Sequence, residues 1–461
     1  MLNLAGQISM IGHGRVGEMV VTERAAVSPV LGCFALSLII LVGIAAYQLA
    51  RPALDAYAVT AMIHAAFYAG AVWWVINKAA CARDFALIII VAIVLRGIAL
   101  NAPPSLTTDG LRYVWDGRIQ WAGFNPYLWV PADQALCHLR DAVIYPNIYL
   151  KETAVTIYPP VAQMLFLIAN AISDSLRGIQ VVMTAMEFVT IAAILAWLKA
   201  DNLPRERVLI YAWHPVPIWE FSSMAHLDSA ATALLMLTIV AVVRGRQGLA
   251  GALLAAAVLT KYFPLVLAPA LWRRWDWRMP VAFSVTAVAL SLPYVAGAGT
   301  KILGFLFNHL DNEGYSAGYG FHLLWVLRDY GLWAPAGKIY VAIALLIMGG
   351  FGFVALFGRR ANEIRPEHMV VLAAALVWLT SPHYTWYFGW LIPLLARYPS
   401  PSVIAFSLLS IVQSSPGYAS WATLTFFHTT IFGVGLVLML AEGLWRQLSQ
   451  RASPAVVSTR P

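Results

Sequence analysis

Long apolar runs, separated by short polar or basic segments, dominate the pattern along the chain. The first three runs are Ser28–Ala50, Ala56–Ile76 and Phe85–Leu100. Each is close to the length of roughly 20 residues with which a helix crosses a bilayer. Further runs follow as far as Leu444, and several of them are much shorter. The pattern predicts an all-α, polytopic transmembrane helix bundle with about 12–14 spans, and it excludes a transmembrane barrel.

Basic residues gather in the short segments between these runs, which predicts the orientation of the bundle. Basic segments face the cytoplasm in membrane proteins, and Lys78 with Arg83 and Arg244 with Arg246 are typical pairs. This rule places both termini inside. It requires that Tyr158–Ala171 does not cross and that the stretch around Lys261 forms two short helices. Val208–Met224 and Leu227–Val243 are then expected as separate crossings, joined by the short outer loop Ala225–Asp228.

The longest polar segment, Asn101–Ile157, falls outside the membrane in this topology. Loops of this length without a function are uncommon in compact domains. We expect short interfacial helices within it, at Val114–Trp121 and Ala135–Val143. The sequence therefore predicts a cytoplasmic N-terminal segment, a single membrane domain with a large outer loop, and a cytoplasmic tail, over residues 1–27, 28–445 (loop 101–157) and 446–461.

Composition supports this class of protein. The chain has 61% hydrophobic and 11% charged residues, whereas soluble domains carry about 25% charged residues. The net charge of +8 lies in the basic segments between runs, so it indicates membrane orientation and no nucleic-acid partner. The three cysteines lack the C-x-x-C spacing of a metal or redox site, and no disulfide framework is predicted.

Two carboxylates of the outer loop are candidates for catalysis, Asp109 and Asp116. A carboxylate at the membrane interface can accept a proton from a hydroxyl group as a general base. The alternative for Asp109 is a helix cap, in which Thr108 or Asp109 starts a helix at Gly110. The alternative for Asp116, seven residues on, is a salt bridge to an arginine, Arg112 or Arg118.

Ionisable residues within or beside the later apolar runs are the next candidates, because charged groups in a membrane are costly and are usually functional. The segment from His214 to Asp228 contains four such residues: His214, Glu220, His226 and Asp228. His226 and Asp228 fit hydrogen bonding to a substrate or a structural pair. Two ligands without a third argue against a metal site.

Lys261, His383 and Tyr387 complete the candidates. Lys261 stands between two apolar runs, where a lysine reaches the interface or binds an anionic phosphate. His383 opens an aromatic corner that includes Tyr387. An interfacial aromatic belt is the alternative explanation for that corner. The chain has no Gly-rich phosphate loop, no G-x-S-x-G and no H-E-x-x-H motif, which argues against ATP-driven transport and the corresponding hydrolases.

The order of these motifs resembles the glycosyltransferase-C superfamily. The first loop carries D-x-x-x-Y-x-x-x-G from Asp109 through Tyr113 to Gly117. An N-P-Y turn ending at Tyr127 and a Y-P-P helix start at Tyr158 follow. The likeness is closest to the polyprenyl-phosphate-mannose-dependent mannosyltransferases of glycosyltransferase family 87, and more distant to the first mannosyltransferase of GPI-anchor synthesis. The later matches are A-H-L-D at 225–228 (G-H-N-D in the family), T-K-Y-F-P at 260–264 and S-P-H-Y-T-W-Y at 381–387.

The resemblance implies an inverting transfer of a hexose, in the closest relatives mannose, from a polyprenyl-phosphate sugar to a hydroxyl of a glycan or glycolipid. Asp109 would be the base, with Asp116 second. The resemblance also implies a site on the extracytoplasmic face of the inner membrane, with no metal and no cofactor beyond the lipid-linked donor. The alternative is a transporter or flippase of lipid-linked sugars, which would show paired broken helices in two similar halves. The implied substrate-binding residues are Arg112, Tyr113, Tyr127, Tyr158, His226, Asp228, Lys261, His383 and Tyr387.

Overall fold

The computed structural model describes residues 27–51, 53–78, 82–303, 314–315, 318, 320–360, 363–415 and 421–452. Within these ranges the chain forms helices and no strands, so the predicted all-α class is confirmed. Nearly all of the predicted N-terminal segment 1–27, and the tail beyond Ala452, lie outside the described residues.

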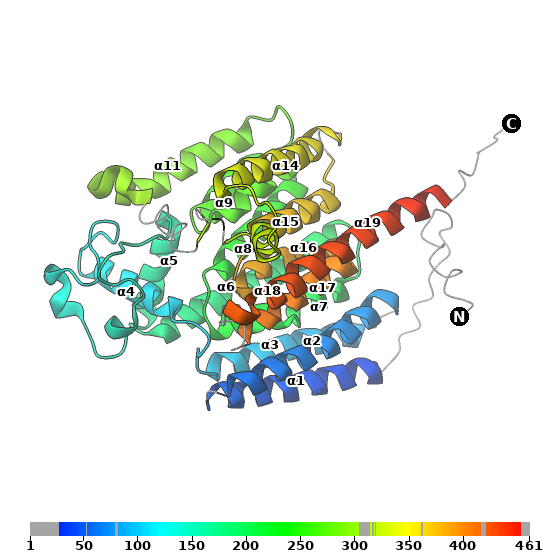
Figure 1. Cartoon of the computed structure of the whole chain (residues 1–461), viewed down its shortest axis with the longest axis horizontal. Helices are drawn as coiled ribbons and strands as arrows, with labels where there is room; N and C mark the ends of the chain where they lie inside the picture. Colours follow the sequence, from blue (N-terminus) through cyan, green and yellow to red (C-terminus); the bar gives the residue numbers. More distant parts are fainter. Residues whose placement is uncertain are drawn as a thin grey trace.

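Three long helices near the N-terminus form one side of the bundle (Figure 1, blue). They are α1 (Pro29–Leu49), α2 (Leu54–Asn77) and α3 (Ala82–Asn101), and α1 packs against both of the others. Pro29 begins α1, at a helix position where the missing N–H costs no hydrogen bond. Their outward faces keep apolar side chains such as Leu36 and Ile90 exposed, as expected for helices in contact with lipid.

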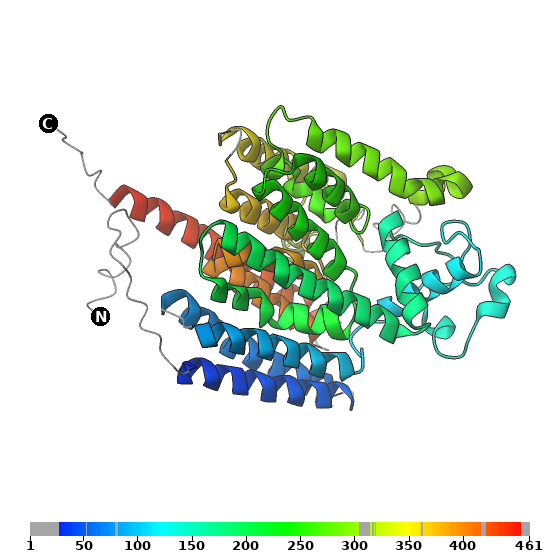
Figure 2. The same cartoon turned by 180° about the vertical axis from the view of Figure 1, so that it is seen from behind.

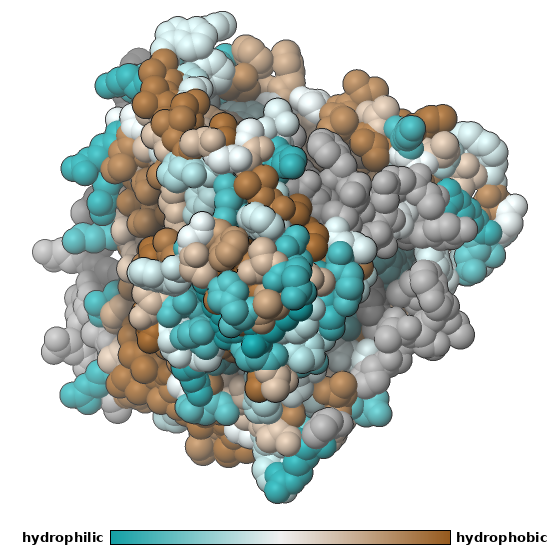
Figure 3. Space-filling model, turned by 90° about the vertical axis from the view of Figure 1, so that its left-hand side faces the viewer, coloured by the Kyte–Doolittle hydropathy of each residue, from teal (hydrophilic) through white to brown (hydrophobic). Residues whose placement is uncertain are grey.

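The polar segment after α3 lies beyond one end of the bundle, together with α5 (Figure 1, cyan and blue-green). It contains α4 (Asp109–Trp121) and two 3-10 helices, η1 (Gln134–Leu139) and η2 (Tyr145–Asn147); α5 (Pro160–Ile172) follows. A helix is present where the first of the two was predicted, with an earlier start, whereas the second is only the short η1. Their position at the membrane surface stays a prediction. Figure 3 looks onto this end of the molecule, where hydrophilic side chains gather near the centre and hydrophobic ones flank them.

Helix α4 packs on α5 through a glycine. A Cβ atom added at Gly117 would lie 2.5 Å from the carbonyl oxygen of Phe166, which is closer than two such atoms can approach. Glycine is therefore required where the two helices meet. This contact explains the last position of the D-x-x-x-Y-x-x-x-G pattern and fixes the aspartate at the other end of α4 relative to the membrane helices.

The segment between α6 (Leu176–Ala200) and α8 (Asp228–Val243) differs from the prediction. The apolar run Val208–Met224, expected as one crossing, is broken into short pieces. Pro215 and Pro217 lack the backbone N–H that a continuous helix needs. The pieces are η3 (Arg205–Val208), α7 (Leu209–Ala212) and the π-helix η4 (Pro217–Ser223).

The π-helix η4 meets α8 at an angle of 114°. The bend between them is residues 225–228, all of which are 0% exposed. In place of a simple loop between two straight crossings, the A-H-L-D segment is therefore a buried corner. It lies among α6, α8 and the 3-10 helix η7 (Thr385–Leu391), which the bent segment contacts. A bend of this kind places ionisable residues inside the bundle without exposing them to lipid.

The stretch around Lys261 forms two short helical pieces, as predicted. Helix α9 (Gln247–Val258) ends before Lys261, and η5 (Phe263–Leu267) with α10 (Ala268–Leu271) follows it. Seen from behind, α8 and α9 lie between the early helices and the later ones (Figure 2). The remaining helices are α11 (Arg278–Ala298), η6 (Gly299–Leu303), α13 (His322–Asp329), α14 (Gly337–Phe357), α15 (Pro366–Thr380), α16 (Ile392–Arg397), α17 (Pro401–Leu409), η8 (Ser410–Ser414), α18 (Trp421–His428), η10 (Thr429–Gly433) and α19 (Val434–Ala452).

Seven helices among the described residues are long and apolar enough to cross a membrane, or eight if the bent pair η4–α8 counts as one span. Four shorter apolar helices of 10–17 residues, α5 among them, lie beside them. The protein is therefore an integral membrane protein with a polytopic helix bundle. The predicted 12–14 crossings are reached only if shorter helices also cross, so that number stays a prediction.

A buried ion pair joins α3 to α6 within the bundle. The guanidinium of Arg96 lies 2.6 Å from a carboxylate oxygen of Glu187, and both side chains are almost fully buried. Arg96 also donates to the carbonyl of Ala212 at 2.8 Å. The second oxygen of Glu187 accepts a hydrogen bond from Ser222 in η4. The network thus connects two spanning helices to the π-helix that leads into the bend.

Candidate active site

Four interruptions of the helices converge at the end of the bundle that carries α4. Asp109 is the first residue of α4, and Asp228 is the first residue of α8. Lys261 lies between α9 and η5, and Tyr387 lies in η7. Helix ends leave backbone groups and polar side chains without intrahelical partners, so they are the usual places where a helical bundle builds a site.

Lys261 and Asp228 form the centre of the group. The Lys261 ammonium lies 2.6 Å from Asp228 Oδ2. It also lies over the Tyr387 ring, 4.3 Å from the ring centroid, within the range of a cation–π interaction. The side chain of Asp228 is 0% exposed, while that of Lys261 keeps 21% of its surface accessible. The ammonium group can therefore still reach a ligand while it compensates the buried carboxylate.

Asp109 faces this ion pair, close enough for the charges of both Lys261 and Asp228 to act on it. The capping alternative is not what the structure shows. Thr107 accepts a hydrogen bond from the Asp109 N–H at 3.1 Å, and the N-cap residue Thr108 makes no side-chain capping bond. Burial raises the pKa of the Asp109 carboxyl, and the charge of Asp228 adds to the rise, while Lys261 and the Thr107 hydroxyl oppose it. A raised pKa makes a carboxylate a stronger base.

If Asp109 is the predicted general base, the rate of the catalysed reaction should fall at low pH. This fall should occur at a higher pH than for an aspartate with an ordinary pKa. Asp109 must be ionised to accept a proton, and its pKa is raised from the ordinary 3.8. Activity is then present above the raised pKa and is lost as the pH falls through it. A pH profile of kcat/KM checks this. Thr107→Val removes a group that lowers the pKa, so it should move the acid limb to still higher pH. An acid limb at the ordinary aspartate value would contradict the assignment.

Two tyrosines, Tyr113 and Tyr158, lie close enough to Asp109 for its charge to act on them. The rings of Tyr113 and Tyr158 meet edge to face, with centroids 5.0 Å apart. Burial raises the pKa of both phenols well above its ordinary value, so both hydroxyls keep a proton that they can donate. Tyr127 has a different position. Its hydroxyl donates to the carbonyl of Tyr158 at 2.6 Å, which connects the N-P-Y turn to the Y-P-P helix start.

Asp116 forms a salt bridge with an arginine, which was one of the two alternatives that the sequence allowed for it. Its Oδ1 lies 2.8 Å from Arg112 Nε, and its Oδ2 accepts a hydrogen bond from Gln163 at 3.1 Å. The Asp116 side chain is 0% exposed. A carboxylate with both oxygens engaged and no access is poorly placed to accept a proton from a substrate. This geometry favours the structural alternative for Asp116. Arg112 also donates to the Ala154 carbonyl at 3.1 Å, which fixes the end of the loop to α4.

His226 lies at the buried bend before α8. Its ring stacks on Trp386, with centroids 3.8 Å apart. Its Nε2 lies 3.4 Å from Glu220 Oε2 of the π-helix. Glu220 and Trp386 are not among the residues that the sequence singled out for binding. The signal for Glu220 was present, because a carboxylate inside an apolar run is costly. Nothing in the spacing indicated the stacking of Trp386.

Two further histidines lie apart from the ion pair. His383 has ring contacts with Tyr315, at 6.3 Å between centroids, and with His428, at 5.2 Å. His214 faces Ser407, with 3.0 Å between Nε2 and Oγ, and packs against Tyr68. The structure therefore gives His214 a structural environment, while His383 borders the site through its neighbours in η7. The described residues contain no group of three or more potential ligands placed to hold a metal ion.

Ala225 carries backbone strain at the bend. Its φ is +63°, in the left-handed region where a Cβ atom costs about 1–2 kcal/mol. Glycine stands at this position in the family segment that A-H-L-D resembles, and glycine adopts such a φ without that penalty.

Ala225→Gly should therefore stabilise the protein by about 0.5–1 kcal/mol, since the relief of strain exceeds the entropy that glycine adds to the unfolded chain. Thermal unfolding of the purified protein in detergent measures the change. Ala231→Gly, within α8, is the matched control and should destabilise by about 1 kcal/mol. A loss of stability in Ala225→Gly would contradict the strain argument.

Comparison with known proteins identifies the class: the chain is a membrane glycosyltransferase. The family model that matches is that of glycosyltransferase family 87, over residues 156–382. The match covers just under half of the chain, and it confirms the resemblance seen in the sequence. The matched residues include Tyr158, His226, Asp228 and Lys261, whereas Asp109 and α4 precede them. No curated protein and no solved structure matches the chain. The match favours an enzyme over the alternative of a transporter.

Proposed function

We propose that the protein transfers a hexose, specifically mannose, from a polyprenyl-phosphate sugar to a hydroxyl group of a glycan or glycolipid, with inversion at the anomeric carbon. One observation carries this proposal. Asp109 lies partly buried at the interface end of α4, and it faces the ammonium of Lys261 next to Asp228. A base and a cation close to one another are what an acceptor hydroxyl and a leaving phosphate need.

In the proposed reaction, Asp109 accepts the proton of the acceptor hydroxyl while its oxygen forms the new bond to the anomeric carbon. The bond from that carbon to the phosphate oxygen breaks, and its electron pair stays with the phosphate. The carbon passes through an oxocarbenium-like transition state, and attack from the face opposite the phosphate inverts its configuration. Lys261 stabilises the charge that develops on the leaving phosphate. Tyr113 and Tyr158 can donate to sugar or phosphate oxygens.

The proposed partners follow from this reaction: a polyprenyl-phosphate sugar as donor, a glycan or glycolipid as acceptor, and membrane lipid around the bundle. The mechanism uses no metal and no cofactor. Purified protein in nanodiscs, supplied with radiolabelled polyprenyl-phosphate mannose and a membrane extract as acceptor source, tests it. A labelled, mannosylated product supports the proposal. Transfer from a nucleotide-linked mannose in place of the lipid-linked one would overturn it.

We propose further that the site faces the extracytoplasmic side of the inner membrane. The basis is the positive-inside distribution of Arg and Lys in the short segments at the other ends of the helices. Alkaline phosphatase fused near Asp133 should be active, because this enzyme folds only outside the cytoplasm. The same reporter fused after Arg246 is the control and should be inactive. An inactive alkaline phosphatase fused near Asp133, which would indicate a cytoplasmic location, would refute the proposed orientation.

A further inference from the structure

Glu220 and His226 form a buried acid–imidazole contact beside the proposed site. Glu220 is 3% exposed and His226 is 0% exposed. The backbone holds them in register, because the His226 N–H donates to the Glu220 carbonyl at 2.9 Å. Their side chains approach to 3.4 Å between Oε2 and Nε2. Contacts between catalytic groups are often long without substrate and shorten when it binds.

The imidazole of His226 has ring nitrogens that are available to hydrogen-bond a ligand. Among the described residues, neither of its ring nitrogens has a partner with hydrogen-bond geometry, and neither does Asp228 Oδ1. Leaving a buried polar atom without a partner is energetically costly. Stacking on Trp386 fixes the plane of the ring. Polar atoms kept in this way beside Lys261 indicate a substrate that supplies the missing partners.

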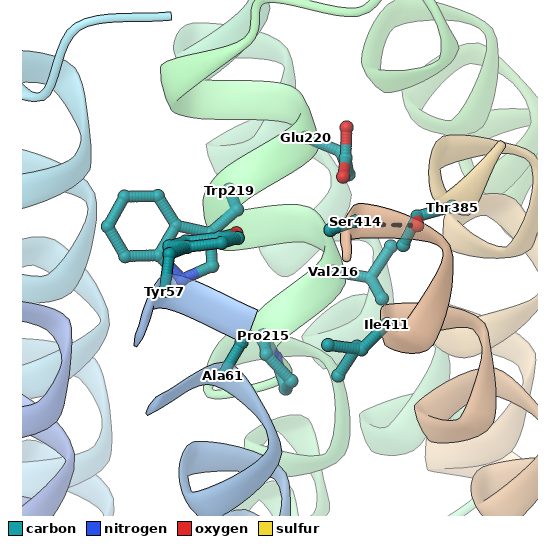
Figure 4. A pocket seen from close by; sticks show the side chains of 9 residues that line it. All are labelled: Tyr57, Ala61, Pro215, Val216, Trp219, Glu220, Thr385, Ile411 and Ser414. Atoms are coloured by element: carbon teal, nitrogen blue, oxygen red, sulfur yellow. Dashed lines mark hydrogen bonds between the residues drawn. The ribbon is translucent and has the colours of Figure 1, made fainter. Parts of the chain in front are cut away.

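Among the described residues, the His226 imidazole is the one basic group that forms an ion-pair contact with Glu220. Glu220 lines a small hollow of about 10 Å³ together with Tyr57, Thr385 and Ser414. Figure 4 shows its carboxyl group on the side of this hollow near Thr385 and Ser414, with Tyr57 on another side. The charged groups that act on it are those of Asp228 and Asp109, both acidic, and Lys261 is bound to Asp228. An isolated carboxylate here would be uncompensated, so the two side chains are best described as a pair that shares one proton.

We propose that Glu220 is a positioning residue for sugar transfer: it holds the His226 imidazole by a shared proton at Nε2, so that the Nδ1–H group donates a hydrogen bond to the phosphate of the lipid-linked donor. This inference rests on the proposed function. It gives His226 a specific partner on the substrate and assigns a role to a carboxylate that transfer would otherwise leave unused.

The shared proton allows the Glu220–His226 pair to respond to the negative charge that develops on the phosphate during transfer. As the bond between the anomeric carbon and the phosphate oxygen breaks, negative charge develops on the phosphate. The proton then moves from Glu220 onto His226 Nε2, which leaves an imidazolium at the phosphate and a carboxylate behind it. No proton enters or leaves the pair in this step, and the acceptor proton still goes to Asp109. A donor that strengthens only as the leaving group departs lowers the barrier and not the KM.

Glu220→Gln tests the pair. Glutamine can hydrogen-bond to Nε2 but has no proton to transfer, so kcat should fall about 10- to 100-fold with little change in KM for the donor. The wild-type pair loses its shared proton at high pH, and Nδ1 then becomes an acceptor. The alkaline limb of the kcat profile should therefore disappear in Glu220→Gln, while the acid limb due to Asp109 stays. Glu220→Asp keeps a transferable proton and should retain the alkaline limb.

Ser414→Ala is the matched control, because Ser414 borders the same hollow and has no part in the pair (Figure 4). It should keep both limbs and a normal kcat. An unchanged alkaline limb in Glu220→Gln overturns the inference, whatever the loss of rate, because a purely structural role would leave the pH profile in place.

Binding of a polyprenyl phosphate to the protein in nanodiscs, followed by native mass spectrometry, separates this inference from the proposed function. Polyprenyl phosphate is the leaving group and carries the negative charge that the intact donor lacks, so Glu220→Gln and His226→Ala should each weaken its binding about 10-fold even though Glu220→Gln changes the donor KM little. If the wild type binds the lipid phosphate but transfers no sugar, the proposed function fails and the pair is still tested by these two variants. If the wild type does not bind it, or both variants bind it normally, the inference is overturned.

Discussion

Asp109→Asn should reduce sugar transfer by about 10²- to 10⁴-fold, the usual contribution of a positioned general base. The amide has the size of the carboxyl group but cannot accept the acceptor's proton. Asp109 is partly exposed at the start of α4, and Thr107 supplies the capping contact, so folding should not depend on its charge. Rates of transfer from a labelled lipid-linked donor, measured at saturating donor and acceptor, check the loss. Thermal unfolding in detergent should show an unchanged midpoint.

The comparison variant is Asp116→Asn. Asp116 is buried and bonded to Arg112, so the amide leaves that guanidinium without its counter-charge. We expect this variant to lose stability first, and to lose activity in proportion to the folded fraction. Near-normal turnover in Asp109→Asn, together with loss of turnover in folded Asp116→Asn, would make Asp116 the base.

Lys261→Gln should lower kcat/KM for the donor by about 10²- to 10³-fold, the effect of removing one preorganised group that stabilises developing charge. The loss has two physical causes. The leaving phosphate loses its cation, and the fully buried Asp228 becomes an unpaired negative charge that repels the phosphate. Initial rates at varied donor concentration measure the change. Lys261→Arg keeps the charge but not the compact ammonium geometry, so it should recover part of the activity.

A double variant separates the two causes. Lys261→Gln with Asp228→Asn removes both charges and should restore the stability lost in Lys261→Gln, since no buried charge remains uncompensated. It should not restore transfer if the ammonium group acts on the phosphate. Recovery of transfer in the double variant would show that Lys261 serves only to neutralise Asp228.

Local patterns allowed much of this molecule to be predicted. The helix that begins near Asp109, the short helix after the Y-P-P start and the break at Lys261 all follow from nearby residues. Proline positions and the lengths of apolar runs determine them. The membrane class follows from composition alone, because so little charge cannot cover a soluble surface.

Contacts between distant parts of the chain could not be predicted from the sequence in the same way. Lys261 and Asp228 are separated by 33 positions, and no periodicity relates them. The same holds for the stacking of His226 on Trp386. The sequence predicted the A-H-L-D segment as an outer loop because two apolar runs flank it. The buried 114° bend instead depends on how η4 and α8 pack within the bundle, which hydropathy does not encode.

The ion pair between Arg96 and Glu187 has a consequence for biosynthesis. An arginine inside α3 costs about 2.5–3.5 kcal/mol at the centre of an inserting helix, and its partner is made only 91 residues later on α6. Until α6 emerges, α3 should therefore remain near the translocation machinery or keep water around Arg96. Release of α3 into lipid would then follow the synthesis of α6, and the two helices would leave the insertion channel as a unit.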